Sequence, residues 1–281
     1  MEPSVLAPDL VERVLARLGF GASPEPDLAG LCALYDAWCR RVPFDNVRKR
    51  IHLARGEAGA LPGDAPGEFF ADWLRDGTGG TCWAGNGALC ALLAALGFRA
   101  QRGLATMLVA PDLPPNHGTV SVALDGARWL LDASILFQEP LRLRDDGPTA
   151  VAHPAWGVAT RVADGRRTVR WRPFHLDGLD CRIDSLEATP EEFRRRHEAT
   201  RSWSPFNYQL SARLLRDDGV VGVAFGSRAA ISAAGEVSVA PFAPGERLAF
   251  LVETLGLREE VAAALPDDVP MPPPPRAPSK D

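Results

Sequence analysis

The spacing of apolar residues changes at Gly97, and this change constrains the fold more than any other feature. Before it, apolar residues recur every three or four positions, as in residues 9–18 and 28–40, which predicts amphipathic helices. After it, short alternating segments dominate, and Asp125-Gly126 is a hairpin signal between two of them. We therefore expect an α+β protein, with a helical first part followed by antiparallel strands.

Cys82 stands where a loop is expected to meet a helix. Residues 79–81, Gly-Gly-Thr, break the chain before it, and an apolar run over residues 88–96 follows. The amino end of a helix carries unpaired N–H groups and partial positive charge, which favour the nucleophilic thiolate. A lone cysteine is more often a small buried residue, and that structural role fits the other four better. These are Cys32, Cys39, Cys90 and Cys181.

Two residues downstream can complete a catalytic group with Cys82. His117 opens the alternating segment 117–124, and Asp132 ends the returning segment 128–132 after the hairpin turn. A tight hairpin brings its two ends together, so we expect His117 and Asp132 to be neighbours. A histidine at a strand start is more often an ordinary packing or surface residue. Together, however, the three residues suggest a thiol nucleophile, an imidazole base and a carboxylate that orients the base.

These residues resemble the arylamine N-acetyltransferases. The pattern Gly-Gly-x-Cys-aromatic-x-x-Asn over residues 79–86, followed by His117 and Asp132, has the order and spacing of that family. The first third of the chain agrees, because residues 42–46, Val-Pro-Phe-Asp-Asn, resemble the family's Pro-Phe-Glu-Asn element. The similarity extends over about residues 8–265.

Three departures from the family pattern lie close to these residues. The family usually has an arginine before the double glycine and an acidic residue two positions after the cysteine, where this chain has Thr78 and Ala84. After the aspartate the family typically has Val-Gly-Phe-Gly, where residues 133–136 are Ala-Ser-Ile-Leu. We expect the side chains of Ser134 and Leu136 to obstruct the acyl pocket. Acetyl-CoA would then be used less efficiently than by a typical family member, whereas small activated esters would still react.

The resemblance implies a fold of three parts around a cysteine-protease-like Cys-His-Asp core. These are an N-terminal helical bundle over residues 1–97, an antiparallel β-barrel over residues 98–200 and a C-terminal α/β lid over residues 201–265. The cysteine belongs to the first part, and the histidine and aspartate belong to the second. Residues 266–281 are rich in proline and poor in core residues, which predicts a disordered tail.

The resemblance also implies an activity. A small acyl group would pass from a CoA thioester, typically acetyl-CoA, to Cys82 and then to an arylamine or hydrazine. Backbone N–H groups near Cys82 would hold the tetrahedral oxyanion. The residues implied at the substrate and cofactor pocket are Phe44, Thr81, Trp83, Gly118, Ser134 and Phe206. Two other interpretations stay open: a cysteine hydrolase or amide synthase that uses the same triad, and a degenerate homologue that only binds a ligand.

Composition limits the partners and the location. The net charge of −5 argues against a broad nucleic-acid footprint. The chain has no basic amino-terminal region and no apolar stretch of about 20 residues, so we expect neither a signal peptide nor a membrane span. Five cysteines without framework spacing indicate a reducing, cytoplasmic setting. Without Cys-x-x-Cys or His-x-x-x-His, no metal site is expected, and the oligomeric state is left open.

Two charged segments are expected to face solvent. Residues 48–50, Arg-Lys-Arg, form a short run of positive charge, which is usually solvated. Residues 194–197 are Arg-Arg-Arg-His and would form the exposed face of a helix. That helix is predicted to begin at Thr189, with Thr189 as N-cap and Glu192 completing a capping box.

Overall fold

Helices fill the first third of the chain, as the sequence predicts. The computed structural model describes residues 6–109 and 113–273. Its first five helices are α1 (Pro8–Leu18), α2 (Leu28–Arg41), α3 (Val47–Ala54), α4 (Pro66–Asp76) and α5 (Cys82–Ala95). Helices α1 and α2 match the predicted segments 9–18 and 28–40 closely. Gly19 closes α1 with a left-handed φ of 90°, and Asp27 caps α2 by accepting a 2.7 Å hydrogen bond from the Gly30 N–H.

The middle of the chain forms an eight-stranded antiparallel sheet. Its strands are β2 (Arg99–Met107), β3 (His117–Leu124), β4 (Ala127–Leu131), β5 (Leu141–Leu143), β6 (Ala150–Val151), β7 (Val158–Ala163), β8 (Arg166–Trp171) and β9 (Leu179–Ala188). They lie in the order β5-β4-β3-β2-β9-β8-β7-β6, and the edge strands β5 and β6 approach each other, so the barrel is nearly closed. Asp125 and Gly126 have φ values of 49° and 70°, which makes the predicted hairpin turn between β3 and β4.

The last third of the chain forms a second sheet with short helices. Its strands are β10 (Ala212–Arg216), β11 (Gly219–Ala224), β12 (Ser227–Ser232) and β13 (Val237–Pro241). The helices are α6 (Pro190–Ala199), the 3-10 turn η1 (Pro205–Asn207), α7 (Glu246–Ala249), the π-helical turn η2 (Phe250–Thr254) and α8 (Glu259–Ala263). A two-residue strand from the first third, β1 (Phe44–Asp45), pairs with β10 and completes this sheet.

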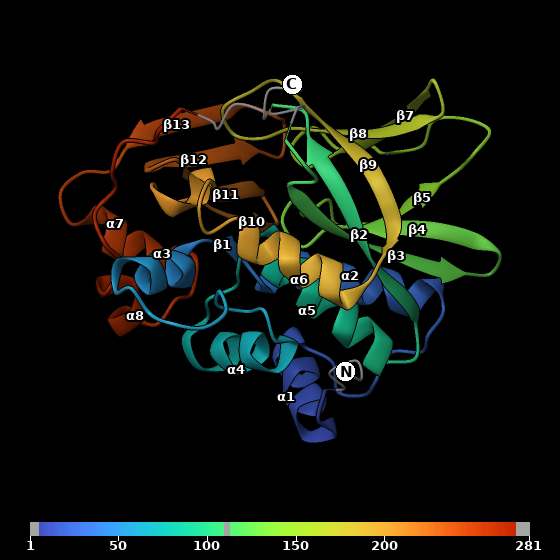
Figure 1. Cartoon of the computed structure of the whole chain (residues 1–281), viewed down its shortest axis with the longest axis horizontal. Coiled ribbons are helices and arrows are strands. Elements are labelled where there is room, and N and C mark those ends of the chain that lie inside the picture. Colours follow the sequence, from blue (N-terminus) through green and yellow to red (C-terminus); the bar gives the residue numbers. More distant parts are fainter. Residues whose placement is uncertain (1–5, 110–112, 274–281) are drawn as a thin grey trace, which may run out of the picture.

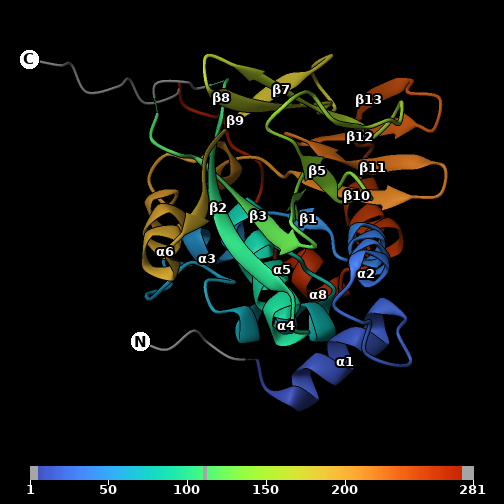
Figure 2. The ribbon, with the colours of Figure 1, turned by 90° about the vertical axis from the view of Figure 1, so that its right-hand side faces the viewer.

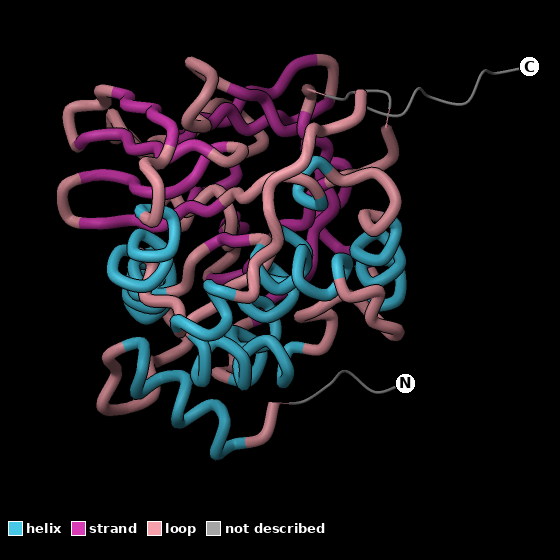
Figure 3. Tube along the Cα trace, turned by 90° about the vertical axis from the view of Figure 1, so that its left-hand side faces the viewer, coloured by secondary structure: helices cyan, strands magenta, loops and turns pink. Residues whose placement is uncertain are grey.

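Most helices lie on one side of the molecule and most strands on the other (Figures 1 and 3). Figure 2 shows α5 behind β2 and β3, among the other helices of the first third. Helix α5 is apolar on every side, and most of its residues are buried, because it packs against α4, α6, β2 and β3 at once. The predicted α+β fold is confirmed, and α5 holds its first residue, Cys82, at the meeting of the helices and the barrel.

The prediction that two charged segments face solvent is confirmed for Arg194 and Arg195, which are exposed, and is wrong for Lys49, Arg50 and His197. Lys49 and Arg50 are 4% and 2% exposed, and His197 is 3% exposed. The side chain of Lys49 donates a hydrogen bond of 2.9 Å to Thr200 Oγ1, and that of Arg50 lies 2.5 Å from Asp268 Oδ1. The charges of α3 are therefore buried between α6 and the end of the chain. The predicted N-cap is confirmed, because the Glu192 N–H donates to Thr189 Oγ1 at 3.1 Å.

The ordered chain also extends past Leu265, where the sequence predicts that the tail begins. Arg50 donates to the carbonyl oxygens of Pro266 and Asp267 at 3.1 and 2.7 Å, and the Val269 N–H donates to the Tyr208 carbonyl at 3.1 Å. A buried guanidinium anchors these residues, which pattern alone does not reveal. Part of the predicted tail, residues 274–281, lies outside the described residues.

This anchor predicts different effects for two truncations. Ending the chain after Val269 keeps Asp268 and should leave the melting temperature nearly unchanged. Ending it after Leu265 leaves the Arg50 guanidinium buried without its carboxylate, and removing one partner of a buried pair costs about 3–5 kcal/mol. We expect the melting temperature to fall by roughly 10 °C, measured by calorimetry. Equal melting temperatures for the two truncated chains would contradict the anchor.

The division into bundle, barrel and lid stays a prediction, and the pairing of β1 with β10 crosses it. No helix within residues 6–109 and 113–273 is both long and apolar enough to span a membrane.

Candidate active site

The loop before Cys82 is held against β1 by close backbone contact. A Cβ atom on Gly79 would lie 1.7 Å from the Pro43 carbonyl oxygen, so only glycine fits there. The side chain of Asp45 accepts hydrogen bonds from the Gly79 N–H at 2.6 Å and from the Val47 N–H at 3.0 Å. Burial is the largest influence on Asp45 and raises the pKa of its carboxyl to about 6. The Pro-Phe-Asp-Asn element thus fixes the path of the chain into α5.

Cys82 is the first residue of α5, as predicted, and is 6% exposed. Thr81 takes the N-cap position, but its side chain makes no capping hydrogen bond to any part of the chain that the structure describes. The first N–H groups of α5 are therefore left without a side-chain cap beside the thiol. N–H groups in this position can stabilise a negative charge on an oxygen atom close to Cys82.

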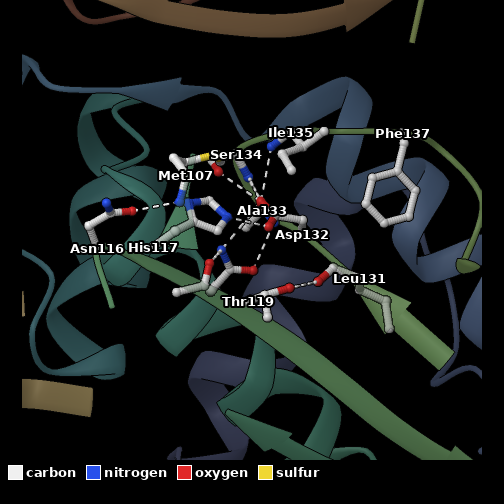
Figure 4. Close-up of polar contacts among 12 residues, drawn as sticks. Met107, Asn116, His117, Thr119, Leu131, Asp132, Ala133, Ser134, Ile135 and Phe137 are labelled. Atoms are coloured by element: carbon white, nitrogen blue, oxygen red, sulfur yellow. Dashed lines mark hydrogen bonds and ion pairs between the residues drawn. The ribbon is translucent and has the colours of Figure 1, made fainter. Parts of the chain in front are cut away.

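His117 and Asp132 lie together in the core, and their predicted proximity is confirmed. The imidazole Nε2 lies 2.6 Å from Asp132 Oδ2, and the two residues are 3% and 1% exposed (Figure 4). Burial opposes protonation of the ring, but the Asp132 carboxylate and the Cys82 thiolate outweigh it and raise the pKa of His117 to about 10. Because Nε2 faces Asp132, Nδ1 is the ring nitrogen available to Cys82, whose thiolate favours the protonated ring. The arrangement favours a thiolate–imidazolium pair.

The second oxygen of Asp132 is fixed by three donors on the segment that follows it. Asp132 Oδ1 accepts hydrogen bonds from the Ser134 N–H at 2.9 Å, the Ser134 hydroxyl at 2.7 Å and the Ile135 N–H at 3.0 Å (Figure 4). Burial alone would raise the pKa of Asp132, but the positive charge of His117 and these hydrogen bonds lower it below its usual value. The carboxylate thus stays ionised in a site closed to bulk water.

Two residues that the sequence did not single out for a role hold the backbone around Asp132. The Asn86 side chain donates to the Gly118 carbonyl at 2.7 Å and accepts from the Ala133 N–H at 2.9 Å, so it ties α5 to both arms of the hairpin. The Tyr35 hydroxyl donates to the Asp132 carbonyl at 2.9 Å and accepts from its N–H at 3.1 Å. Asn86 belongs to the cysteine pattern, which was a usable signal. Tyr35 gave no such signal, because it is one of several residues on the apolar face of α2.

The segment 133–136 supports Asp132 and the core, and its predicted obstruction of the acyl pocket stays a prediction. The Ser134 hydroxyl is committed to Asp132, and Leu136 is fully buried in the main hydrophobic core. Leu136 has a φ of 58°, the left-handed conformation that favours the glycine usual at this position in the family. The leucine side chain offsets that backbone strain by filling the core. This segment therefore supports the Asp132 carboxylate.

The other two departures from the family pattern also have local explanations. Thr78 is fully buried and accepts a 2.9 Å hydrogen bond from Arg48, whose guanidinium also contacts Asp72 and Asp76. The Cβ atom of Ala84 lies against the loop between α3 and α4. A Cβ atom added to Gly63 of that loop would be only 2.7 Å from it. A longer acidic side chain at position 84 would collide with that loop.

The residues expected around the pocket form two aromatic groups. Phe44 packs edge-on against Phe206 at 5.2 Å between ring centroids. Trp83 packs edge-on against Phe193 of α6 at 4.9 Å, in the same apolar cluster as Cys82. Trp83 is 2% exposed, and within the described chain its Nε1 has no hydrogen-bond partner. The structure thus gives Trp83 a packing role, and its assignment to substrate binding stays a proposal.

Gly118 is required by this packing, and a substitution tests it. A Cβ at position 118 would lie 2.7 Å from the Phe193 ring and 3.0 Å from the Trp83 ring. We expect Gly118→Ala to destabilise the protein by about 1–3 kcal/mol through overpacking, measured by denaturant unfolding. Gly147→Ala is the matched control, since nothing in the described chain lies within 4 Å of its added Cβ. Equal stability of the two variants would show that the aromatic pair adjusts freely.

Across residues 6–109 and 113–273, no group of three or more His, Cys, Asp or Glu side chains is placed to hold a metal ion.

Known proteins resemble this chain in both sequence and fold. A family model described as N-acetyltransferase matches residues 27–163. The curated arylamine N-acetyltransferase of Mycolicibacterium smegmatis is 33% identical over 176 residues, which cover 57% of this chain and 62% of that protein. The matched region thus spans less than two thirds of that relative.

Solved structures extend the likeness of fold to most of the chain. The arylamine N-acetyltransferase from Mycobacterium abscessus superposes with a TM-score of 0.75 at 21% identity, covering 90% of this chain and 92% of that one. The Mycobacterium marinum arylamine N-acetyltransferase in complex with CoA gives a TM-score of 0.71 at 22% identity, covering 90% and 93%. The fold is therefore that of the α+β proteins with a helical part, a barrel and a second sheet seen in these structures. The sequence matches are to the same proteins, so the chain is similar to the arylamine N-acetyltransferases in both sequence and fold.

Proposed function

We propose that this protein transfers an acetyl group from acetyl-CoA to an arylamine or hydrazine through an acyl-enzyme on Cys82. The observation that carries the proposal is the buried pair of His117 and Asp132, 2.6 Å apart, which faces a cysteine at the amino end of α5. The match to the N-acetyltransferase family model supports acetyl transfer, and the likeness to a structure solved with CoA supports the donor. The setting that we propose is the cytoplasm, where thiols stay reduced.

In the first step the thiolate of Cys82 attacks the carbonyl carbon of the thioester. The bond between that carbon and the CoA sulfur breaks, and the leaving thiolate takes the proton from the His117 imidazolium. The free N–H groups at the start of α5 stabilise the oxyanion of the tetrahedral intermediate. One thioester replaces another, so this step has little net driving force.

In the second step the amine attacks the acetylated Cys82. His117, now neutral, accepts the proton that the amine loses, and the thiolate leaves as the amide forms. Asp132 keeps the imidazole oriented throughout and stays ionised. The stable amide product drives the two steps together.

Burial of the site favours transfer to an amine over hydrolysis. Cys82, His117 and Asp132 are 6%, 3% and 1% exposed, so the intermediate would be shielded from water until an acceptor enters. The intact histidine–aspartate pair also supports an active enzyme over a degenerate ligand-binding homologue.

Intact-mass spectrometry tests this proposal in two stages. Mixing the protein with acetyl-CoA should add the mass of one acetyl group, which peptide mapping should locate on Cys82. Adding a panel of arylamines and hydrazines should then remove the group faster than buffer alone does. Loss of the group at the same rate with and without amine would indicate a hydrolase. Absence of acylation by any acyl-CoA would contradict the proposed donor.

A further inference from the structure

Lysine is almost absent from this chain, which makes the position of Lys49 informative. The sequence has 31 lysine and arginine residues, of which only Lys49 and Lys280 are lysines. Arginine carries the positive charge everywhere else. An arginine stays charged at all ordinary pH values, whereas a buried lysine can lose its proton. A buried lysine can therefore release and take up a proton, which the arginines of the chain cannot.

Lys49 lies beside the loop that leads into Cys82. Its side chain is 4% exposed, and together with Gly79, Gly80 and Thr81 it lines a small cavity of about 10 Å³. Among the charged groups near its ammonium group, the thiolate of Cys82 acts most strongly on the pKa of Lys49, which it raises. The lysine on α3 and the cysteine on α5 are thus brought together by the path of residues 79–81.

The contacts of Lys49 suit both of its protonation states. Its Nζ donates to Thr200 Oγ1 at 2.9 Å and to the Thr200 carbonyl at 3.4 Å. The Thr200 hydroxyl gives its own proton to the His197 carbonyl at 2.7 Å, so its lone pairs face Lys49. A neutral amine keeps two N–H donors, so Lys49 can lose a proton without losing Thr200.

The surrounding charges leave the protonation of Lys49 sensitive to Cys82. The titratable and charged groups that face it or line its cavity are Cys82 on α5; His197, Glu198 and Arg201 on and after α6; Asp45 and Arg48 around the start of α3; and Asp72 on α4. Burial is the largest influence and lowers the pKa of Lys49 to about 7, assisted by Arg201 and opposed by Cys82 and Glu198. Removing the thiolate charge would lower the pKa further.

We propose that Lys49 is a positioning residue whose ammonium group stabilises the Cys82 thiolate and which loses its proton when Cys82 is acylated. The stabilisation of the thiolate by Lys49 concerns the free enzyme alone. Only the loss of the proton on acylation rests on the proposed function. Acylation replaces the thiolate by a neutral thioester, so the buried ammonium loses its favourable partner and releases its proton to water. The proton returns when the amine acceptor takes the acyl group and restores the thiolate.

Nuclear magnetic resonance of lysine labelled with ¹³C at Cε tests this directly, because the chain gives only two lysine signals. A Lys280→Arg variant assigns them. We expect the Lys49 signal to titrate near pH 7 in the full-length protein, and about one pH unit lower in Cys82→Ala, which lacks the thiolate. A midpoint near the ordinary lysine value of about 10.4, or the same midpoint in both proteins, would overturn the proposal.

The rate at which iodoacetamide alkylates Cys82 provides a second readout, with two variants as a matched pair. Below pH 7 Lys49 is protonated and its charge favours the thiolate. Its removal in Lys49→Met should therefore shift the low-pH side of the alkylation profile to higher pH by about one unit. Lys49→Arg keeps a positive charge and should leave that side of the profile in place. Equal shifts in the two variants, at matched melting temperatures, would indicate lost packing instead of lost charge and would contradict the proposal.

Neither measurement uses an acyl donor, so each result is separate from that of the proposed function. If acetyl-CoA fails to acylate Cys82 but Lys49 still responds to the thiolate, the proposed function fails and the electrostatic pair stands.

Discussion

Replacing Cys82 by alanine should abolish acylation of the protein completely. Cys82 alone among the five cysteines combines the start of a buried helix with a histidine and an aspartate beside it. Burial raises the pKa of the thiols of Cys32, Cys39, Cys90 and Cys181, which disfavours their reactive form. Intact mass after mixing with acetyl-CoA measures the effect.

Cys90→Ala is the matched control, since Cys90 lies on the same helix and is 4% exposed. It should lose some stability through packing and keep its acylation. An acylated Cys82→Ala protein would end the proposed mechanism.

Replacing Asp132 by asparagine should reduce acyl transfer by about 10²-fold to 10⁴-fold while the fold persists. The Oδ1 position receives three donors from Ser134 and Ile135, so the asparagine must place its oxygen there. Its NH₂ group then faces His117 Nε2, which forces the ring proton onto Nδ1. The nitrogen that faces Cys82 can no longer accept a proton.

The pH dependence of Cys82 alkylation separates this effect from unfolding. In the wild type the carboxylate outweighs burial and holds the pKa of His117 at about 10, so the imidazolium persists from acid pH through neutrality. We expect iodoacetamide to react with Cys82 well below the free-thiol value of about 8.5. In Asp132→Asn, burial acts on His117 without the carboxylate, its pKa falls, and the onset of alkylation should move toward that free-thiol value. Identical profiles at equal melting temperatures would show that Asp132 does not support the pair.

Local signals allowed the helices, the hairpin and the three central site residues to be predicted. The apolar spacing of α1 and α2 and the Asp125-Gly126 turn depend on neighbouring residues only, and the hairpin then brings His117 to Asp132. The resemblance to known sequences contributed the three-part architecture.

What could not be predicted depends on residues far apart in the chain. The charges of α3 are buried because Thr200 and Asp268 meet them there, and no pattern near position 49 indicates those partners. Nor did the sequence indicate where the Leu136 side chain lies, because only its departure from the Gly-Phe-Gly of the resembling family was visible. Leu136 is fully buried with a φ of 58°, so its side chain fills the core from a backbone conformation that favours glycine.

The pairing of β1 with β10 has a consequence for how the protein is made. During synthesis Phe44 and Asp45 leave the ribosome early, but their strand partners Ala212 and Arg213 follow only in the last third of the chain. Until then the carboxylate that braces Gly79 belongs to an unpaired strand, and the cysteine loop lacks its final support. Contacts between residues so distant in sequence form slowly. A nascent chain that already contains all three central site residues would thus lack the final support of the Cys82 loop until translation is nearly complete.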